Sequence, residues 1–182
     1  MCAAQDVDVL SPPPESTGGT GLWRRFALPA VLVIVIDQAT KVWADNRLTA
    51  GPCLPGGDEC IDLVLGLRFH LVHNQGAAFS TGPQLGPVFG LVALLMSVVL
   101  FNLARKRNDA LGQVLLGLIA GGAIGNLIDR IVRADDGLLS GAVIDFIDVQ
   151  WWPVFNVADS AVVVGVIALI VYSFLEADVE GG

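Results

Sequence analysis

The sequence alternates between four long apolar runs and shorter polar segments. The apolar runs cover residues 26–44, 85–104, 110–128 and 154–175, and the second and third contain no charged residue. About 20 mostly apolar residues are enough to cross a lipid bilayer as a helix. The pattern therefore predicts an α-helical integral membrane protein with four transmembrane helices, which we place in one membrane domain over residues 23–176.

The two ends of the chain are polar. Residues 1–22 include three consecutive prolines and too few apolar residues to bury a core, which predicts a disordered cytoplasmic tail. Residues 177–182 are predicted to be a second, short cytoplasmic tail. Arg24 and Arg25 before the first apolar run are also typical of a secretory signal peptide. That run continues into charged, helix-compatible residues up to Lys41, which favours a membrane-spanning helix instead.

The long loop between the first two apolar runs, residues 45–83, contains an alternating segment. Between Leu67 and Asn74, apolar residues alternate with mostly polar ones, and residues 61–65 offer a partner strand. A period of two is typical of a half-buried strand. We therefore expect a small extracytoplasmic β element between the first two helices, resting on the outer membrane surface. Cys53 and Cys60 lie seven residues apart in this loop. They are able to pair in an oxidising compartment, but only the geometry decides.

Composition supports lipid as the solvent of this chain. Hydrophobic residues make up 54% and charged residues 15% of the sequence, whereas charged residues make up about 25% of soluble domains. The net charge of −8 argues against nucleic acid as a partner. We expect membrane lipid as a partner and a monomeric protein. The two histidines and three cysteines form no metal-ligand motif, so we expect neither a metal nor a cofactor.

The basic residues indicate the orientation in the membrane. They crowd the start of the first run and the short turn between the second and third: Arg24, Arg25, Arg105, Lys106 and Arg107. Lys and Arg concentrate in cytoplasmic loops, so we expect both termini in the cytoplasm and residues 45–83 and 130–153 outside. Tryptophan is enriched at membrane interfaces, and every tryptophan falls at a predicted span boundary: Trp23, Trp43, Trp151 and Trp152.

Several ionisable residues interrupt the apolar runs. Each costs about 2.5–3.5 kcal/mol near the centre of a bilayer, so each is a functional candidate. Asp37 and Lys41 are one helical turn apart, either as a structural ion pair with Lys41 extending toward the interface or as a substrate contact. Asn126, Asp129 and Arg130 share one helix face by their spacing, either as an interfacial cap with an ion pair or as part of a site.

Two further aspartates lie near the outer end of the fourth run. Asp159 faces the same way as Asn156, three residues earlier, and no cation on its own helix pairs with it. Asp145 lies in a short apolar stretch of the outer loop, with Asp148 three residues later as a competing candidate. Together with Asp37 and Asp129, these carboxylates fall at one depth, and a shared polar site is the simplest explanation.

A carboxylate cluster of this kind is typical of aspartyl chemistry. Two close carboxylates share one proton, so one of them acts as general base on water while the other hydrogen-bonds the scissile carbonyl. A proton channel or transporter is a rival hypothesis, but it predicts a polar path through the inner halves of the helices, and the sequence contains none. A non-enzymatic assembly factor is a second rival. It would use the close-packing stripe of Gly117, Gly121 and Gly125 and not need the aspartates.

The chain resembles bacterial lipoprotein signal peptidase (signal peptidase II). Five segments match this family in order: residues 37–41 (DQATK), 74–80 (NQGAAFS), 125–130 (GNLIDR), 143–146 (VIDF) and 155–160 (FNVADS). The resemblance implies a four-helix aspartic endopeptidase of the bacterial inner membrane, with its active site near the outer face. Such enzymes remove signal peptides from diacylglyceryl-modified prolipoproteins, cutting before the lipidated cysteine.

The resemblance also assigns roles to residues. It places the catalytic pair at Asp145 and Asp159, where the physical argument alone ranks Asp129 beside Asp159. The supporting or substrate-binding positions that it implies are Asp37, Lys41, Asn74, Gly76, Asn126, Asp129, Arg130 and Asn156.

Overall fold

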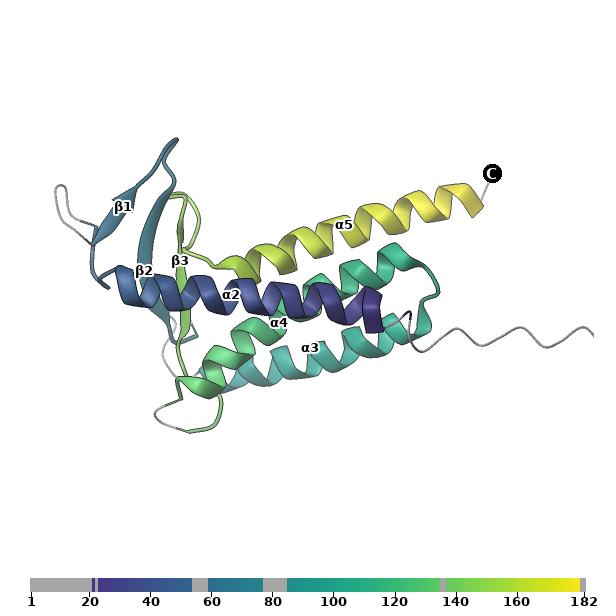
Figure 1. Cartoon of the computed structure of the whole chain (residues 1–182), viewed down its shortest axis with the longest axis horizontal. Helices are drawn as coiled ribbons and strands as arrows, with labels where there is room; N and C mark the ends of the chain where they lie inside the picture. The colour runs from purple at the N-terminus through teal and green to yellow at the C-terminus, as the bar shows by residue number, and fades with distance from the viewer. Residues whose placement is uncertain (1–20, 22, 54–58, 77–84, 135–136, 181–182) are drawn as a thin grey trace, which may run out of the picture.

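The computed structural model describes residues 21, 23–53, 59–76, 85–134 and 137–180. Four long helices lie along one another (Figure 1). They are α2 (Leu28–Arg47, preceded by the π-helical turn η1, Trp23–Ala27), α3 (Gly86–Lys106), α4 (Ala110–Val132) and α5 (Val157–Glu180). Within these residues, four helices are long and apolar enough to cross a membrane, which confirms the predicted fold class. The predicted tail at residues 1–22 lies almost entirely outside the described residues.

The helix boundaries follow local sequence signals. Asp109 caps α4 by accepting a hydrogen bond from the Gly112 N–H at 2.6 Å, and Pro29 and Pro87 occupy the first turns of α2 and α3, where proline costs no helical hydrogen bond. α4 and α5 extend beyond the predicted spans, to Val132 and Glu180. Arg130 is therefore helical, as its predicted place on one helix face with Asn126 and Asp129 requires.

Helix α4 is the centre of the bundle. About 61% of the residues in its apolar segment are buried, against 28% or less in the other three helices. The predicted glycine stripe makes this possible. Gly117 and Gly121 pack against the backbone of the first span at Phe26 and Ala30, and a Cβ at Gly121 would lie 2.7 Å from the Ala30 carbonyl oxygen. The prediction of close helix packing is confirmed.

A three-stranded antiparallel sheet lies across one end of the bundle (Figure 1). Its order is β1 (Cys60–Asp62), β2 (Arg68–Asn74), β3 (Val143–Asp148). The β element predicted within residues 45–83 is confirmed by the pairing of β1 with β2. The sheet also contains β3, which comes from the α4–α5 connection and was not predicted. β3 is buried on both faces, and its four apolar residues do not alternate one by one with polar ones, so it lacks the period of two that marks a half-buried strand.

The sheet is fixed to the end of α2. The Trp43 ring packs edge-on against Phe69 of β2 and Phe146 of β3, with ring centroids 5.1 and 6.3 Å apart. Cys60 at the start of β1 forms a disulfide with Cys53 in the preceding loop. The structure therefore answers whether these two cysteines pair. The turn between α3 and α4 lies at the opposite end of the bundle from the sheet (Figure 1). The sheet end therefore holds every loop that carries a candidate site residue.

Candidate active site

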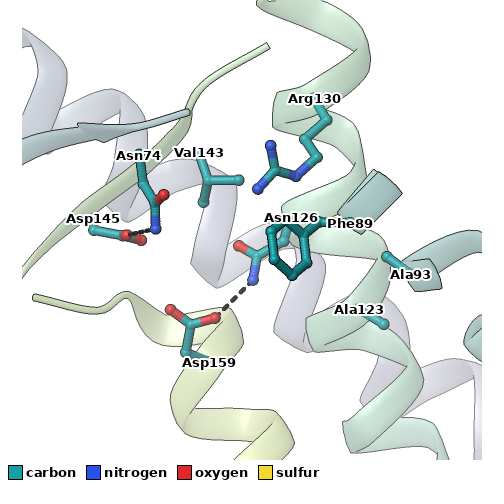
Figure 2. Close-up of a pocket in the computed structure, with 9 residues that line it drawn as sticks. All are labelled: Asn74, Phe89, Ala93, Ala123, Asn126, Arg130, Val143, Asp145 and Asp159. Carbon is teal, nitrogen blue, oxygen red and sulfur yellow. Dashed lines mark hydrogen bonds between the residues drawn. The ribbon is translucent and has the colours of Figure 1, made fainter. Parts of the chain in front are cut away.

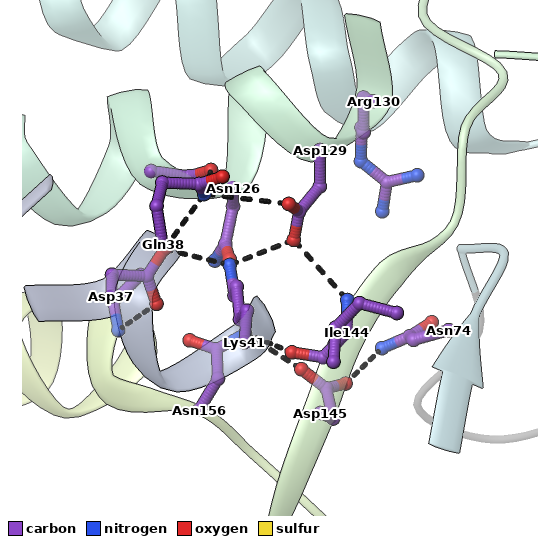
Figure 3. A network of polar contacts seen from close by, with 12 residues as sticks. Asp37, Gln38, Lys41, Asn74, Asn126, Asp129, Arg130, Ile144, Asp145 and Asn156 are labelled. Carbon is purple, nitrogen blue, oxygen red and sulfur yellow. Dashed lines mark hydrogen bonds and ion pairs between the residues drawn. The ribbon is translucent and has the colours of Figure 1, made fainter. Parts of the chain in front are cut away.

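Polar side chains from α2, α4, β2, β3 and the residue just before α5 meet where the sheet contacts the bundle (Figure 3). Asp159 of α5 lies beside them (Figure 2). The four aspartates of the predicted cluster all lie in this region, but they fall into two pairs with different partners. We call Asp37 and Asp129 the closed pair, and Asp145 and Asp159 the pocket pair.

The closed pair is neutralised by a buried lysine. Lys41 Nζ lies 2.8 Å from Asp37 Oδ2 and 2.9 Å from Asp129 Oδ2, and all three side chains are buried. The ion pair between Asp37 and Lys41 was one of the two predicted alternatives. The expectation that Lys41 would extend outward is wrong, because its ammonium points between the helices.

The closed pair also ties separate segments together. Asp37 Oδ1 accepts a hydrogen bond from the Ala158 N–H at 2.9 Å, which connects α2 to the first turn of α5. Asp129 Oδ2 accepts one from the Ile144 N–H at 3.2 Å, which connects α4 to β3 one residue before Asp145. These carboxylates therefore set the positions of the two backbones that carry the pocket pair.

Two contacts of the closed pair escaped the sequence analysis. Gln38 Nε2 donates to the Gly125 carbonyl at 3.1 Å and to Asp129 Oδ1 at 3.4 Å. Arg133 Nε lies 3.6 Å from Asp129 Oδ1, one turn along α4. The i,i+4 spacing of Asp129 and Arg133 was a usable signal, whereas nothing local identifies the role of Gln38.

The pocket pair is held by amides. Asp145 accepts hydrogen bonds from Asn74 Nδ2 at 2.9 Å and Asn156 Nδ2 at 2.7 Å, and Asp159 accepts one from Asn126 Nδ2 at 2.7 Å. Within the described part of the chain, no Lys or Arg forms an ion pair with either carboxylate. The pocket pair therefore lacks the direct cation that neutralises the closed pair.

Asn156 joins the two members of the pocket pair. Its Nδ2 contacts Asp145, while its backbone N–H donates to Asp159 Oδ2 at 3.2 Å and its Oδ1 accepts from the Asp159 N–H at 2.9 Å. The last two bonds form a reciprocal capping box at the start of α5. The same motif that begins the helix thus fixes Asp159 relative to Asp145.

Lys41 connects the closed pair to the pocket pair through Asn126. Lys41 Nζ donates to Asn126 Oδ1 at 2.8 Å, and the other end of that amide donates to Asp159. Because an ammonium only donates, it determines which end of the Asn126 amide faces Asp159. A comparable constraint acts on Asn74, whose Oδ1 accepts from the Gly76 N–H at 3.0 Å, leaving Nδ2 to donate to Asp145.

Gly76 is required by its backbone conformation and by its surroundings. Its φ is +124°, in the region that disfavours side chains. A Cβ there would lie 2.9 Å from the Gly86 nitrogen at the start of α3. Gly76 therefore lets β2 end against α3 with Asn74 correctly placed.

Burial and a neighbouring charge act on the Asp145 carboxyl of the pocket pair. Burial, together with the nearby Asp159 carboxylate, raises the pKa of Asp145 to about 7, although hydrogen bonds from Asn74 and Asn156 act in the opposite direction. A carboxyl with this pKa exchanges its proton near neutral pH, as a general acid or base must.

The pocket pair opens into a pocket of about 210 Å³ (Figure 2). Its polar lining consists of Asn74, Asn126, Arg130, Asp145 and Asp159. Its apolar lining consists of Phe89 and Ala93 of α3, Ala123 of α4 and Val143 of β3. The Arg130 guanidinium lies 5.8 Å from the Phe89 ring centroid and donates to the Gly141 carbonyl at 3.3 Å. The predicted ion pair within the group of Asn126, Asp129 and Arg130 does not form, because Asp129 pairs with cations elsewhere.

Asp148, the competing loop aspartate, has a different environment. Its carboxylate lies 2.6 Å from Arg68 Nε and also accepts the Gln150 N–H at 2.6 Å. Burial alone would raise the pKa of Asp148, but the Arg68 and Gln150 hydrogen bonds and the charges of Arg68 and His70 hold it below its ordinary value. Asp148 does not line the pocket, which separates it from Asp145.

Comparison with known proteins gives a consistent result. The model of the family Peptidase_A8, described as Signal peptidase (SPase) II, matches residues 29–175. The lipoprotein signal peptidase of Mycobacterium avium is 40% identical over 175 residues, covering 92% of each chain. That of Streptomyces coelicolor is 45% identical over 172 residues, covering 92% of this chain and 79% of the relative.

Solved structures agree with the sequence relatives. A structure titled as a bacterial membrane enzyme solved by the in meso method at 2.3 Å resolution superimposes with a TM-score of 0.67 at 29% identity. The match covers 82% of this chain and 87% of that one. A second such structure, at 1.9 Å resolution, gives a TM-score of 0.65. With four spanning helices and a family match over most of its length, the chain belongs to the signal peptidase II family and is a multi-pass bacterial membrane protease.

Proposed function

We propose that this protein is an aspartic endopeptidase that removes signal peptides from diacylglyceryl-modified prolipoproteins, cutting before the lipidated cysteine. The observation that carries the proposal is the pocket pair. Two carboxylates from different elements line one pocket at the end of a membrane bundle, and amides hold them without a direct cation. This arrangement permits the pair to gain and lose a proton.

In the proposed reaction the pocket pair shares one proton. The ionised carboxylate takes a proton from a water molecule, and the water oxygen attacks the scissile carbonyl carbon. The protonated carboxyl donates a hydrogen bond to the carbonyl oxygen as negative charge develops there. The tetrahedral intermediate then collapses, the C–N bond breaks, and the leaving amine takes a proton from the pair. No covalent bond to the enzyme is needed, and the proton belongs to the pair as a unit.

The remaining residues position the reaction. Asn126 and Asn156 hold Asp159 and Asp145, and Lys41 with the closed pair fixes the orientation of Asn126. Among the described residues, the Arg130 guanidinium donates one hydrogen bond, from Nη1 to the Gly141 carbonyl, and we assign its other N–H groups to a substrate carbonyl. Gly76 shapes the end of β2 beside the pocket.

The proposed site lies near the outer face of the inner membrane. The dense basic group at the α3–α4 turn is at the opposite end of the bundle from the sheet, which supports cytoplasmic termini and an outer sheet. The substrate enters from the lipid, with its acyl chains beside the apolar wall of Phe89 and Ala93. Residues 23–176 contain every element of this site, and a monomer suffices.

The test is cleavage of a diacylglyceryl-modified prolipoprotein by the purified protein in liposomes, with the cut position found by mass spectrometry. We expect a cut before the modified cysteine, and loss of cleavage in both Asp145→Asn and Asp159→Asn. Asp148→Asn is the matched control and should keep substantial activity. Near-normal turnover by either pocket-pair variant would overturn the proposal. Proton flux that disappears with Asp159→Asn would favour a transporter instead.

A further inference from the structure

Exposed apolar side chains gather on two connections of the sheet. The turn between β1 and β2 exposes Leu63, Val64 and Leu65, and the β3–α5 connection exposes Trp151 and Trp152. Leu65 is fully exposed, Trp151 is 82% exposed and Val64 is 72% exposed. We call these five residues the apolar rim. None of them is charged, and exposed apolar side chains gathered in this way mark a contact surface.

Specific hydrogen bonds hold the two halves of the apolar rim together. Gln150 Nε2 donates to the Gly66 carbonyl at 2.8 Å, which joins the β3–α5 connection to the β1–β2 turn. The turn itself is closed by the Leu63 N–H to the Leu67 carbonyl at 2.9 Å. The rings of Trp151 and Trp152 pack edge to face, with centroids 6.2 Å apart. The apolar rim is therefore one built unit.

The apolar rim lies where lipid surrounds the bundle. In Figure 1 the strands run across the helix axes, and the β1–β2 turn reaches past the bundle on the side of α5. Trp152 precedes the start of α5 at Val157 by only five residues, which places it at the depth where that span enters the bilayer. Along α5 the surface continues with exposed apolar side chains such as Val163, Val164 and Ile167. The apolar rim thus includes the segment that leads directly into a membrane-spanning helix with an exposed apolar surface.

We propose that the apolar rim inserts into the interfacial layer of the bilayer and anchors the sheet there. Tryptophan prefers this layer because its ring is apolar and its N–H remains able to hydrogen-bond, and the aliphatic turn residues supply buried apolar area. Two aspartates flank the apolar rim in sequence: the exposed Asp62 directly precedes Leu63, and Asp148, which pairs with Arg68, precedes Gln150 by two residues. β3 connects directly to the apolar rim, so the anchor sets the height of Asp145 relative to the membrane. The anchoring itself does not rest on the proposed peptidase reaction.

The test measures tryptophan fluorescence of the full chain in liposomes of phosphatidylcholine brominated at shallow acyl positions. Bromine quenches only tryptophans that contact the acyl region. We expect the quenched fluorescence of the wild type to lose one component in the Trp151→Phe/Trp152→Phe variant. The remaining tryptophans of the first span should stay quenched, which shows that the variant is inserted in the membrane. In the same background, Val64→Trp should restore a component quenched by the shallow bromines.

Two outcomes would overturn the anchor. One is quenching of the Trp151/Trp152 component and of Val64→Trp by aqueous iodide, without quenching by the brominated lipid. The other is quenching that appears only when a prolipoprotein with brominated acyl chains is added to unbrominated liposomes, which would make the apolar rim a substrate contact. Neither outcome depends on turnover, since both readouts are obtained with an enzyme that need not be active.

Discussion

The two aspartate pairs lie at the same end of the bundle, yet the protein treats them differently. The closed pair shares the ammonium of Lys41 and is buried with it. The pocket pair receives amide hydrogen bonds and faces a pocket. The closed pair connects α2 to α4, β3 and α5 through ion pairs and hydrogen bonds. The pocket pair accepts its side-chain hydrogen bonds from the amides of Asn74, Asn126 and Asn156.

The difference teaches which carboxylates are available for chemistry. A buried ion pair has a defined geometry, and removing one partner leaves a charge that the interior cannot solvate. A carboxylate held by amides beside a second carboxylate exchanges its proton more easily, because protonation relieves the repulsion between the two. Position in the membrane makes all four aspartates candidates, but only their partners separate the pair that we propose as support from the pair that we propose as catalytic.

The largest expected effect comes from removing the cation of the closed pair. Lys41→Met leaves Asp37 and Asp129 buried without their shared ammonium, which should lower the free energy of unfolding by about 3–5 kcal/mol. The measurement is denaturant titration in bicelles. Lys106→Met, the same change at an exposed residue at the other end of the bundle, should have little effect. Equal stability of the two variants would remove the distinction between the pairs.

The pH dependence of cleavage tests the pocket pair directly. The pKa of Asp145 is raised to about 7, so the pair loses its shared proton as pH rises through neutrality. We expect kcat/KM to fall above that pH by about tenfold for each further unit. A rate profile that stays flat through neutral pH would show that the pair carries no proton essential to the reaction.

The same carboxyl should make stability depend on pH. Its pKa is raised from 3.8 to about 7 on folding. Between these two pH values, the folded protein therefore holds a proton that the unfolded chain has already released. This stabilisation is fully present below the lower value and is lost as pH rises through the higher one. Asp145→Asn should flatten this part of the curve of unfolding free energy against pH. An unchanged slope in the variant would mean that another group titrates there.

The smallest expected effect concerns the second cation near the closed pair. Arg133 is 3.6 Å from Asp129 and 2.9 Å from the partly exposed Asp45. Partly solvated ion pairs contribute about 0–1 kcal/mol, so Arg133→Gln should lower the unfolding free energy by no more than about 1 kcal/mol. A loss as large as that of Lys41→Met would make Arg133 an equal partner of the closed pair.

Much of the fold was predictable because its signals are local. Runs of apolar residues fixed the four spans, and the glycine spacing indicated where α4 packs closely. β3 was not predicted, because a strand buried on both faces has no alternation. Helix ends were missed by a few residues, since α4 continues to Val132 and α5 to Glu180.

The set of site residues was predictable from the sequence, but the division of its four aspartates into the closed pair and the pocket pair was not. From depth in the membrane alone, Asp129 ranked beside Asp159 as a catalytic candidate. The partners that distinguish these two aspartates are distant in sequence. The Lys41 ammonium that claims Asp129 is on another helix, and the amide that holds Asp159 comes from Asn126. Only the resemblance to a known family moved the catalytic prediction to Asp145, and that assignment stays a prediction.

The most direct measurement is kcat and thermal unfolding on the same preparation of Asp145→Asn. Asparagine keeps the shape of the side chain, although its NH2 group replaces an oxygen that accepts a hydrogen bond from Asn74 or Asn156. We expect kcat to fall by about 10²–10⁴-fold while the variant stays folded at the assay temperature. Turnover close to the wild type, or a loss of activity that only follows a loss of folded protein, would contradict the account.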